Sequence, residues 1–530
     1  MKDKFIKGAA ILSISNIIVK ILGLVYRIPL ANILTDVGIG YLTMSIDVYS
    51  VLLGISTSGV NVAIAKLVSE RLAENDYYGA KKVFRIALIM LTVAGTVSSI
   101  LLLLGAFEIS ELIGDINSYY AIKALVPALF FVPIMSSFRG YFQGHNNMGP
   151  TALSQIVEQL FKIVFAIILS SMLLNEGLDI AAGGASMGSS IGAMIATILI
   201  IVIYINHTRK NKYKYYKGLK IESNTKIIKE ILRISIPLSL GVIVIPIVAF
   251  LDKIIIIRRL SDLNISSKIS AAIIGQISLA QTVVNFPLLF SVSLGISLVP
   301  VISGLIKKNN TKTLNKTIKS SIFLTILIGL PASFGILSLA TPIIEMLYSK
   351  GVDDISVAGN ILGILSISVI FLMIMQSLTA VLQGIGKVNL PIRNIIIGGI
   401  IKLVLTYLLM GIEHIALYGS AISTVVFYLI ASLLDFIAVK KYTSIEIDKM
   451  KFIIKPFIAS IIMFLIVISA KYIILSSLNN ILSIIIAIII GVFIYFVLIF
   501  KFVGIEEKYL RILPNSDRII KILKKIKFLY

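Results

Sequence analysis

The sequence has no cysteine and no tryptophan, and only three of its 530 residues are histidine. Without cysteine the chain can form no disulfide framework, no thiolate metal site and no thiol nucleophile. The histidines, at positions 145, 207 and 414, are too scattered to suggest a histidine metal cluster. Any interfacial aromatic belt must come from the 21 tyrosines and 25 phenylalanines.

Charged residues are also scarce. They make up 14% of the chain, whereas hydrophobic residues make up 58% and the mean hydropathy is +1.00. A soluble globular protein has about 25% charged residues. Because so apolar a chain has more hydrophobic surface than one aqueous core could bury, the composition predicts an all-α integral membrane protein.

Apolar stretches long enough to cross a membrane recur along the whole chain. Crossing the hydrocarbon takes about 20 mostly apolar residues. The sequence predicts about 14 transmembrane helices, near residues 8–32, 41–64, 84–107, 119–142, 151–174, 181–205, 229–251, 271–300, 318–340, 357–382, 391–411, 415–438, 452–475 and 480–502. The 271–300 stretch is interrupted by Pro287. The first stretch is too long for a cleavable signal peptide and has no cleavage site.

The net charge of +23 is distributed as a topology signal. If the N-terminus is cytoplasmic, the inner segments hold 38 of the 49 lysines and arginines, and the outer loops hold six. We therefore expect a multi-pass plasma-membrane protein with both termini in the cytoplasm. The basic inner loops would attract anionic lipid, and no nucleic-acid partner is needed to explain the charge.

A short pattern recurs at an offset of 240 residues. The recurring residues are Gln143, Gly144, Pro150 and Lys162 in the first copy and Gln383, Gly384, Pro391 and Lys402 in the second, with the proline displaced by one. Each copy would hold six spans, so both would enter the membrane with the same polarity, as a parallel repeat. Two such lobes around a central cavity are typical of an alternating-access transporter.

The repeat predicts the domain organisation. It gives an N-lobe of spans 1–6 over residues 1–206, a basic cytoplasmic linker over 207–228, a C-lobe of spans 7–12 over 229–440, two extra spans over 441–502, and a basic cytoplasmic tail over 503–530. A two-lobed transporter of this kind is complete as a monomer.

The first span carries two basic residues, Lys20 and Arg27. A charge inside the membrane costs several kcal/mol, so it usually faces a cavity or a partner. Seven residues apart on one continuous helix, the two would share a face and could bind a phosphate or carboxylate of a substrate. The alternative for Lys20 is that its stem reaches back to the inner interface.

The fifth span carries Glu158 and Lys162, four residues apart. They either neutralise each other on the helix surface or line the cavity, where Glu158 could hold a proton or a cation. Lys402 is the repeat partner of Lys162, but Gly398 stands where the acid would be. It therefore needs an anion or a carbonyl as a partner.

Asp47 in the second span and Asp252 near the end of the seventh are further candidates for substrate binding. Asp252 could instead pair locally with Lys253 or Arg258.

Two charged residues lie near predicted inner ends of spans. Asp435 is expected to pair with Lys440 or Lys441. Arg139 is most simply a positive-inside residue, but its partner could equally be a carboxylate at an inner gate.

Nothing in the sequence indicates an enzyme. Residues 184–188 match a serine-hydrolase elbow in form, but they lie inside the sixth span, where small residues four apart favour close helix packing. There is no Walker A motif and no GxGxxG, so we expect no catalytic residue, no cofactor and no metal site. Transport would be driven by an H⁺ or Na⁺ gradient, the membrane potential or consumption of the product.

Residues 139–159, with their Arg-Gly-Tyr-Phe-Gln-Gly start, resemble the span-four/five signature of bacterial lipid-linked oligosaccharide flippases. Residues 20–27 and 59–70 are similar to other motifs of this family. It belongs to the multidrug/oligosaccharidyl-lipid/polysaccharide exporter (MOP) superfamily. The resemblance is greatest to lipid II flippases of the YtgP/MurJ type and to the stage V sporulation protein B type.

This resemblance implies a flippase that moves an undecaprenyl-diphosphate-linked cell-wall precursor from the inner to the outer leaflet. It implies that Lys20 and Arg27 bind the diphosphate, and that spans 13 and 14 form a groove for the lipid tail. The second-span and eighth-span arginines of the Gram-negative members are not evident here.

Three other functions compete with this interpretation. A cation-coupled drug exporter of the same superfamily should have mainly carboxylates in its cavity, whereas the spans here carry five basic residues and two acidic ones, Asp47 and Glu158. A scaffold for wall synthases would not need the first-span charges. A membrane glycosyltransferase would need an acidic metal-binding pair, which no loop supplies.

Overall fold

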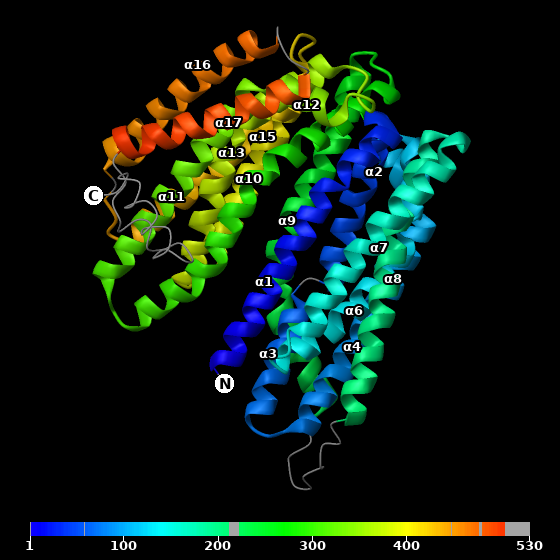
Figure 1. Cartoon of the computed structure of the whole chain (residues 1–530). Helices are drawn as coiled ribbons and strands as arrows, with labels where there is room; N and C mark the ends of the chain where they lie inside the picture. The colour runs from blue at the N-terminus through cyan, green and yellow to red at the C-terminus, as the bar shows by residue number, and fades with distance from the viewer. Residues whose placement is uncertain (1, 58, 211–221, 447, 476–479, 504–530) are drawn as a thin grey trace. The chain divides into compact units, whose positions relative to one another are not determined.

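The structure is a computed structural model that describes residues 2–57, 59–210, 222–446, 448–475 and 480–503. In this part of the chain all regular structure is helical and there is no strand (Figure 1). The predicted all-α fold is thereby confirmed. Residues 211–221 of the predicted linker and 504–530 of the predicted tail lie outside the described residues.

Thirteen helical segments of the described chain are long and apolar enough to cross a membrane. The sequence predicted about 14, and the difference arises near the N-terminus. Arg27–Ala73 is one segment of 47 residues, which as a single helix would be about 70 Å long. It is broken at Thr35 and at Gly59, where φ is positive, and α1 before it contributes only the shorter apolar stretch Ile14–Val25.

The chain divides into two compact units, residues 1–275 and 276–530. The first unit contains α1 (Lys2–Val25), α2 (Arg27–Thr57), α3 (Val60–Ala73), α4 (Tyr77–Ile113), α5 (Tyr119–Lys123), α6 (Val126–Gly144), α7 (Gly149–Leu173), α8 (Leu178–Lys210) and α9 (Asn224–Asp262). Helix α10 (Ser267–Lys307) begins in the first unit and continues into the second, through Pro287. Prolines are tolerated in membrane helices because neighbouring groups satisfy the freed carbonyls.

The second unit continues with α11 (Thr311–Ser338), α12 (Ala340–Tyr348), α13 (Ile355–Gly384), α14 (Asn389–Leu409), α15 (Gly419–Tyr442), α16 (Lys455–Leu475) and α17 (Asn480–Leu498). The predicted extra spans correspond to α16 and α17, which lie side by side (Figure 1). Both helices pack against α11. The Phe334 ring of α11 contacts Phe457 and Phe464 of α16, and the Tyr495 hydroxyl of α17 donates to the Leu327 carbonyl at 2.8 Å.

Helix α9 packs within the first unit. Its residues Ile227 and Ile231 are fully buried in one core with side chains of α3 and α4. At Ser235, α9 approaches Gly59, which has a φ of +76°. A Cβ on Gly59 would lie 2.5 Å from the Ser235 carbonyl oxygen, so this close approach requires glycine. Side-chain packing thus groups α9 with the helices before it, whereas the lobe boundary at 207–228 rests on the sequence repeat and stays a prediction.

Candidate functional site

Helix α1 lies along α7 in the first unit (Figure 1). The Ser15 hydroxyl donates to the Ala152 carbonyl at 3.1 Å. At Gly23, a Cβ would be 3.3 Å from the Gln159 side-chain nitrogen. The small residues of α1 therefore bring its backbone close to the helix that carries Glu158 and Lys162.

Only one residue, Tyr26, separates α1 from α2. Its N–H donates to the Leu22 carbonyl at 3.1 Å, and its carbonyl accepts from the Leu30 N–H at 3.2 Å, as in a helix. Pro29 explains the local interruption, because it has no N–H to donate to the Val25 carbonyl four residues earlier. The shared face of Lys20 and Arg27 stays a prediction.

Arg27 and Lys162 both lie near Tyr26. The Arg27 guanidinium donates to the buried Tyr26 hydroxyl, and the Lys162 ammonium is close enough to act on the same hydroxyl electrostatically. Arg27 and Lys162 are both half-buried, whereas Lys20 is exposed on α1. The structure thus places two basic residues of different helices beside one tyrosine, with a third on the helix that precedes them.

Glu158 bonds across helices. Its carboxylate accepts from the Arg139 guanidinium of α6 at 2.8 Å, and the Arg139 Nε donates to the Ser154 hydroxyl at 2.9 Å. Of the two alternatives for Glu158 and Lys162, the described ion pairs do not include the local pair, and whether the two residues line a cavity stays a prediction. Arg139 outcompetes Lys162 because a fork of fixed N–H donors can reach Glu158 and Ser154 together.

Small residues lock α7 against α8. A Cβ at Gly188 would lie 2.7 Å from the Lys162 carbonyl oxygen, and one at Gly192 would lie 2.5 Å from the Glu158 carbonyl oxygen. The close packing predicted for residues 184–188 is confirmed. It fixes the backbone of α7 at the two positions that carry its charges.

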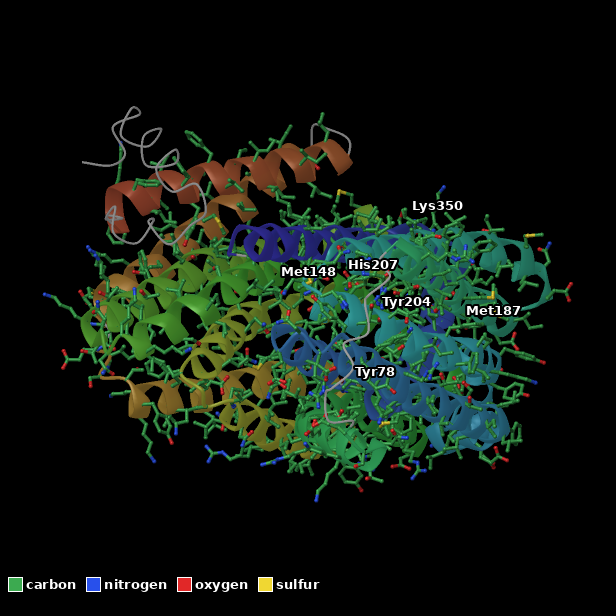
Figure 2. All side chains as sticks on the ribbon, turned by 90° about the horizontal axis from the view of Figure 1, so that it is seen from below. Tyr78, Met148, Met187, Tyr204, His207 and Lys350 are labelled. Atoms are coloured by element: carbon green, nitrogen blue, oxygen red, sulfur yellow. The ribbon has the colours of Figure 1, made fainter. Side chains whose placement is uncertain are left out.

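Aromatic rings hold the end of α6 that carries Arg139. Phe84 of α4 lies with its ring centroid 5.1 Å from Phe138 and 4.8 Å from Tyr141, on either side of Arg139. Tyr204 of α8 closes the cluster, 5.0 Å from Phe84, and His207 follows one turn later (Figure 2). Beyond the end of α6, burial lowers the pKa of His145, which keeps this imidazole neutral near pH 7.

Asp47 and Asp252 meet at one lysine. The Lys253 ammonium on α9 lies 4.0 Å from an Asp47 carboxylate oxygen on α2 and 3.9 Å from Asp252. Lys253 and Asp252 are almost fully buried and Asp47 is half-buried. Of the two partners proposed for Asp252, the structure selects Lys253, and it adds Asp47 from a helix more than 200 residues away.

In the second unit, Lys402 is buried on α14. The prediction that Asp435 pairs with Lys440 or Lys441 is wrong. Its carboxylate accepts from the Asn394 amide at 2.8 Å and from the Thr379 hydroxyl at 3.0 Å. The two lysines follow the carboxylate by more than one turn and are exposed.

Sequence reasoning missed an ion cluster at the start of α9. Arg71 of α3 pairs with Glu222 and, at 2.9 Å, with Glu230 of α9. Hydrogen bonds from Lys226 and Arg71 lower the pKa of Glu222. Arg71 sits in a loop-flanking basic segment, and only its burial distinguishes it from the other positive-inside residues.

The described residues contain no group of three or more histidine, cysteine, aspartate or glutamate side chains that could hold a metal ion. The charged contacts described above join acids with bases, and Arg27 and Lys162 lie beside Tyr26.

Relatives of this chain are known. At 27% identity, it matches the lipid II flippase MurJ of Bacillus subtilis over 83% of this chain and 84% of that protein. At 24% identity, it matches stage V sporulation protein B of the same organism over 84% and 85%.

Solved structures share the fold. A multidrug resistance MATE family transporter of the MOP superfamily, in an inward-facing conformation, aligns with a TM-score of 0.67 at 16% identity, covering 81% of this chain and 98% of that one. The lipid II flippase MurJ, in an inward closed conformation, aligns with a TM-score of 0.65 at 18% identity, covering 92% and 97%.

Two family models match the sequence. The MatE model matches residues 237–408. The model described as polysaccharide biosynthesis protein matches residues 5–306, which is more than half of the chain and includes every charged group around Tyr26 and Glu158. The chain belongs to the polysaccharide biosynthesis protein family.

Proposed function

We propose that the protein is a flippase that moves an undecaprenyl-diphosphate-linked cell-wall precursor, lipid II or a related glycolipid, from the inner to the outer leaflet. The observation that carries the proposal is the gathering of Arg27 and Lys162 around Tyr26. Glu158 is bonded to Arg139, so it does not neutralise Lys162. The site keeps positive charge for a diphosphate.

In this mechanism the basic groups act by binding and orienting. Arg27 offers a planar fork for bidentate bonding to phosphate oxygens, and Lys162 and Lys20 act as point charges that reach the same headgroup. Alternating access then exposes the bound headgroup first to one side of the membrane and afterwards to the other side. Helices α16 and α17 would guide the polyprenyl tail in lipid, and Arg139 with Glu158 would act as an inner gate.

The proposal includes an orientation. Both termini lie in the cytoplasm, because the segments assigned to the inner side hold 38 of the 49 basic residues. The precursor is made on that side, so the basic headgroup site would load from the cytoplasm.

Complementation tests the function. A Gram-positive strain depleted of its lipid II flippases should grow when it expresses this chain. Arg27→Ala should fail, because the headgroup loses its bidentate partner. The matched control is Lys123→Ala, which removes an exposed basic residue from α5. Membrane levels of all three proteins are compared by immunoblot.

Growth with the three proteins tests the function and the site separately. Rescue by wild type and by Lys123→Ala, but not by Arg27→Ala, supports both the substrate class and the site. Rescue by all three keeps the function and removes Arg27 from the site. Failure of a well-expressed wild type argues against lipid II.

The second candidate is a cation-coupled drug exporter. It is favoured by the MatE match over residues 237–408 and by two carboxylates around Lys253, the buried Asp252 and the half-buried Asp47. The complementation separates the two functions, because a drug exporter would not restore growth to a strain that lacks lipid II transport.

A further inference from the structure

Asp435 is a carboxylate enclosed by three helices of the second unit. It lies on α15 with no solvent exposure. One of its oxygens, Oδ1, accepts from the Asn394 amide of α14, and the other, Oδ2, accepts from the Thr379 hydroxyl of α13. Both donors are neutral. A buried carboxylate with only neutral partners carries a large desolvation cost in its charged form.

The groups facing Asp435 supply little positive charge. Helix α13 has no charged or titratable residue along its 30 positions. On α14, the Arg393 guanidinium lies 3.3 Å from the Asn394 amide oxygen, and the described contacts of Asp435 are with Asn394 and Thr379, not with Arg393. Among the described residues no ion pair includes Asp435. The other titratable groups on the elements packed around it are Lys402 and Tyr407 on α14, Tyr418 before α15, and Tyr428, Lys440, Lys441 and Tyr442 on α15.

The sequence repeat shows what is unusual here. At the offset of 240 residues, Arg139 corresponds to Thr379, Ser154 to Asn394 and Glu158 to Gly398. The first unit thus pairs its carboxylate with a permanent cation, at 2.8 Å. In the second unit, the position that corresponds to Arg139 carries the Thr379 hydroxyl, and the carboxylate, Asp435, lies on a third helix, α15.

Replacing a guanidinium by a hydroxyl changes which protonation states of the carboxylate its partner can stabilise. A guanidinium can only donate, so it holds Glu158 in the ionised form. A threonine hydroxyl both donates and accepts, so it can turn to serve either form of an acid. The second unit therefore has the parts for reversible protonation, and the first unit has the parts for a fixed ion pair.

We propose that Asp435 is a proton-binding site and that the proton is carried on Oδ2. A hydronium ion transfers its proton to the carboxylate oxygen and leaves as water, and the Thr379 hydroxyl then accepts from the new O–H. The oxygen Oδ1 is the less suitable atom, because the Asn394 nitrogen can only donate to it.

A proton fits this site better than a sodium ion. A hard cation needs several oxygen ligands. The Asn394 amide oxygen, a further oxygen on a residue that contacts Asp435, already faces the Arg393 guanidinium. Because Asp435 is sealed from water, a proton can enter or leave only when the helices around it separate. Proton exchange is therefore tied to the conformational cycle, and this conclusion does not depend on which substrate is transported.

Infrared difference spectroscopy tests the site without a transport assay. The full-length protein in nanodiscs is titrated with acid, and the carbonyl band of a protonated carboxylic acid is followed. We expect a band that Asp435→Asn abolishes and Glu158→Gln leaves in place. Exchanging potassium for sodium in the buffer should not change the titration.

A second pair of variants addresses the hydroxyl and guards against misfolding of Asp435→Asn. Thr379→Ser keeps a reversible hydroxyl and should leave the band at its frequency. Thr379→Val removes the acceptor of the acid O–H and should move the band to higher frequency. The proposal is overturned if this carbonyl band survives Asp435→Asn, if Thr379→Val does not move its frequency, or if sodium shifts its acid titration.

Discussion

At the scale of single residues, the choice of partner for Glu158 decides the character of the site. Four residues along α7, Lys162 is the expected partner by helix periodicity. Arg139 replaces it because it comes from a neighbouring helix with a fixed fork of donors, and because Ser154 accepts a second bond. The result is a neutral pair near the basic residues around Tyr26, whereas one of the two alternatives from the sequence was a pair neutralised within α7.

The strength of this pair can be measured by a double-mutant cycle. Arg139→Gln should lower the stability of the folded protein by about 3 kcal/mol, because it leaves a half-buried carboxylate without its cation. Glu158→Gln should cost less, since Arg139 keeps its bond to Ser154. The double variant should be more stable than the sum of the two predicts, by at least about 1 kcal/mol. The measurement is thermal unfolding in detergent, and additive effects would contradict the pairing.

Residues such as these mark the limit of sequence reasoning. Periodicity along one helix finds neighbours three or four apart, but it cannot find a partner on another helix. The pairings of Arg139 with Glu158 and of Lys253 with Asp47 needed the packing of helices. The environment of Asp435 was hidden in a different way: the 240-residue offset was visible, yet Thr379 and Asn394 carry no charge and did not stand out.

At the scale of elements, hydropathy placed the helices well and their interruptions poorly. The stretches predicted at 151–174 and 357–382 agree within two residues with α7 and α13. The local interruption at Tyr26 was not predicted, because Pro29 removes a hydrogen bond to the Val25 carbonyl, four residues earlier, without ending the apolar stretch. At Pro287 the sequence suggested an interruption, but α10 continues through this residue.

The contact between α7 and α8 gives a prediction at this scale. Gly188→Val should lower the melting temperature, with a loss of about 1–3 kcal/mol, because the new side chain would meet the backbone of α7 at Lys162 and Ala166. The matched control is Gly105→Val on α4, where the nearest atom to an added Cβ is 3.8 Å away. Thermal unfolding of the two purified variants is compared. Equal loss in both would show that the glycine stripe is not a packing contact.

At the scale of the whole molecule, composition and charge carried the inference furthest. An apolar chain with few charges gave the membrane fold, and the distribution of lysine and arginine gave an orientation. The absence of cysteine makes that orientation easy to test, because each introduced thiol is unique.

Thiol labelling should show Lys350 outside and Lys312 inside. Both side chains are exposed, one after α12 and the other at the start of α11. In intact cells, a membrane-impermeant maleimide should label Lys350→Cys and should label Lys312→Cys only after permeabilisation. The cysteine-free parent is the control for background. The reverse pattern would place both termini outside the cell.

The helical bonding through Tyr26 has a consequence for selectivity. The Tyr26 N–H donates to the Leu22 carbonyl and its carbonyl accepts from the Leu30 N–H, so α1 leads into α2 with only a local interruption. A helix of this kind holds Cα atoms seven residues apart at about 10 Å, whatever the ligand. A headgroup that bridges Lys20 and Arg27, as the proposed function requires, would have to match that fixed spacing, so substrates would be selected by size as well as by charge.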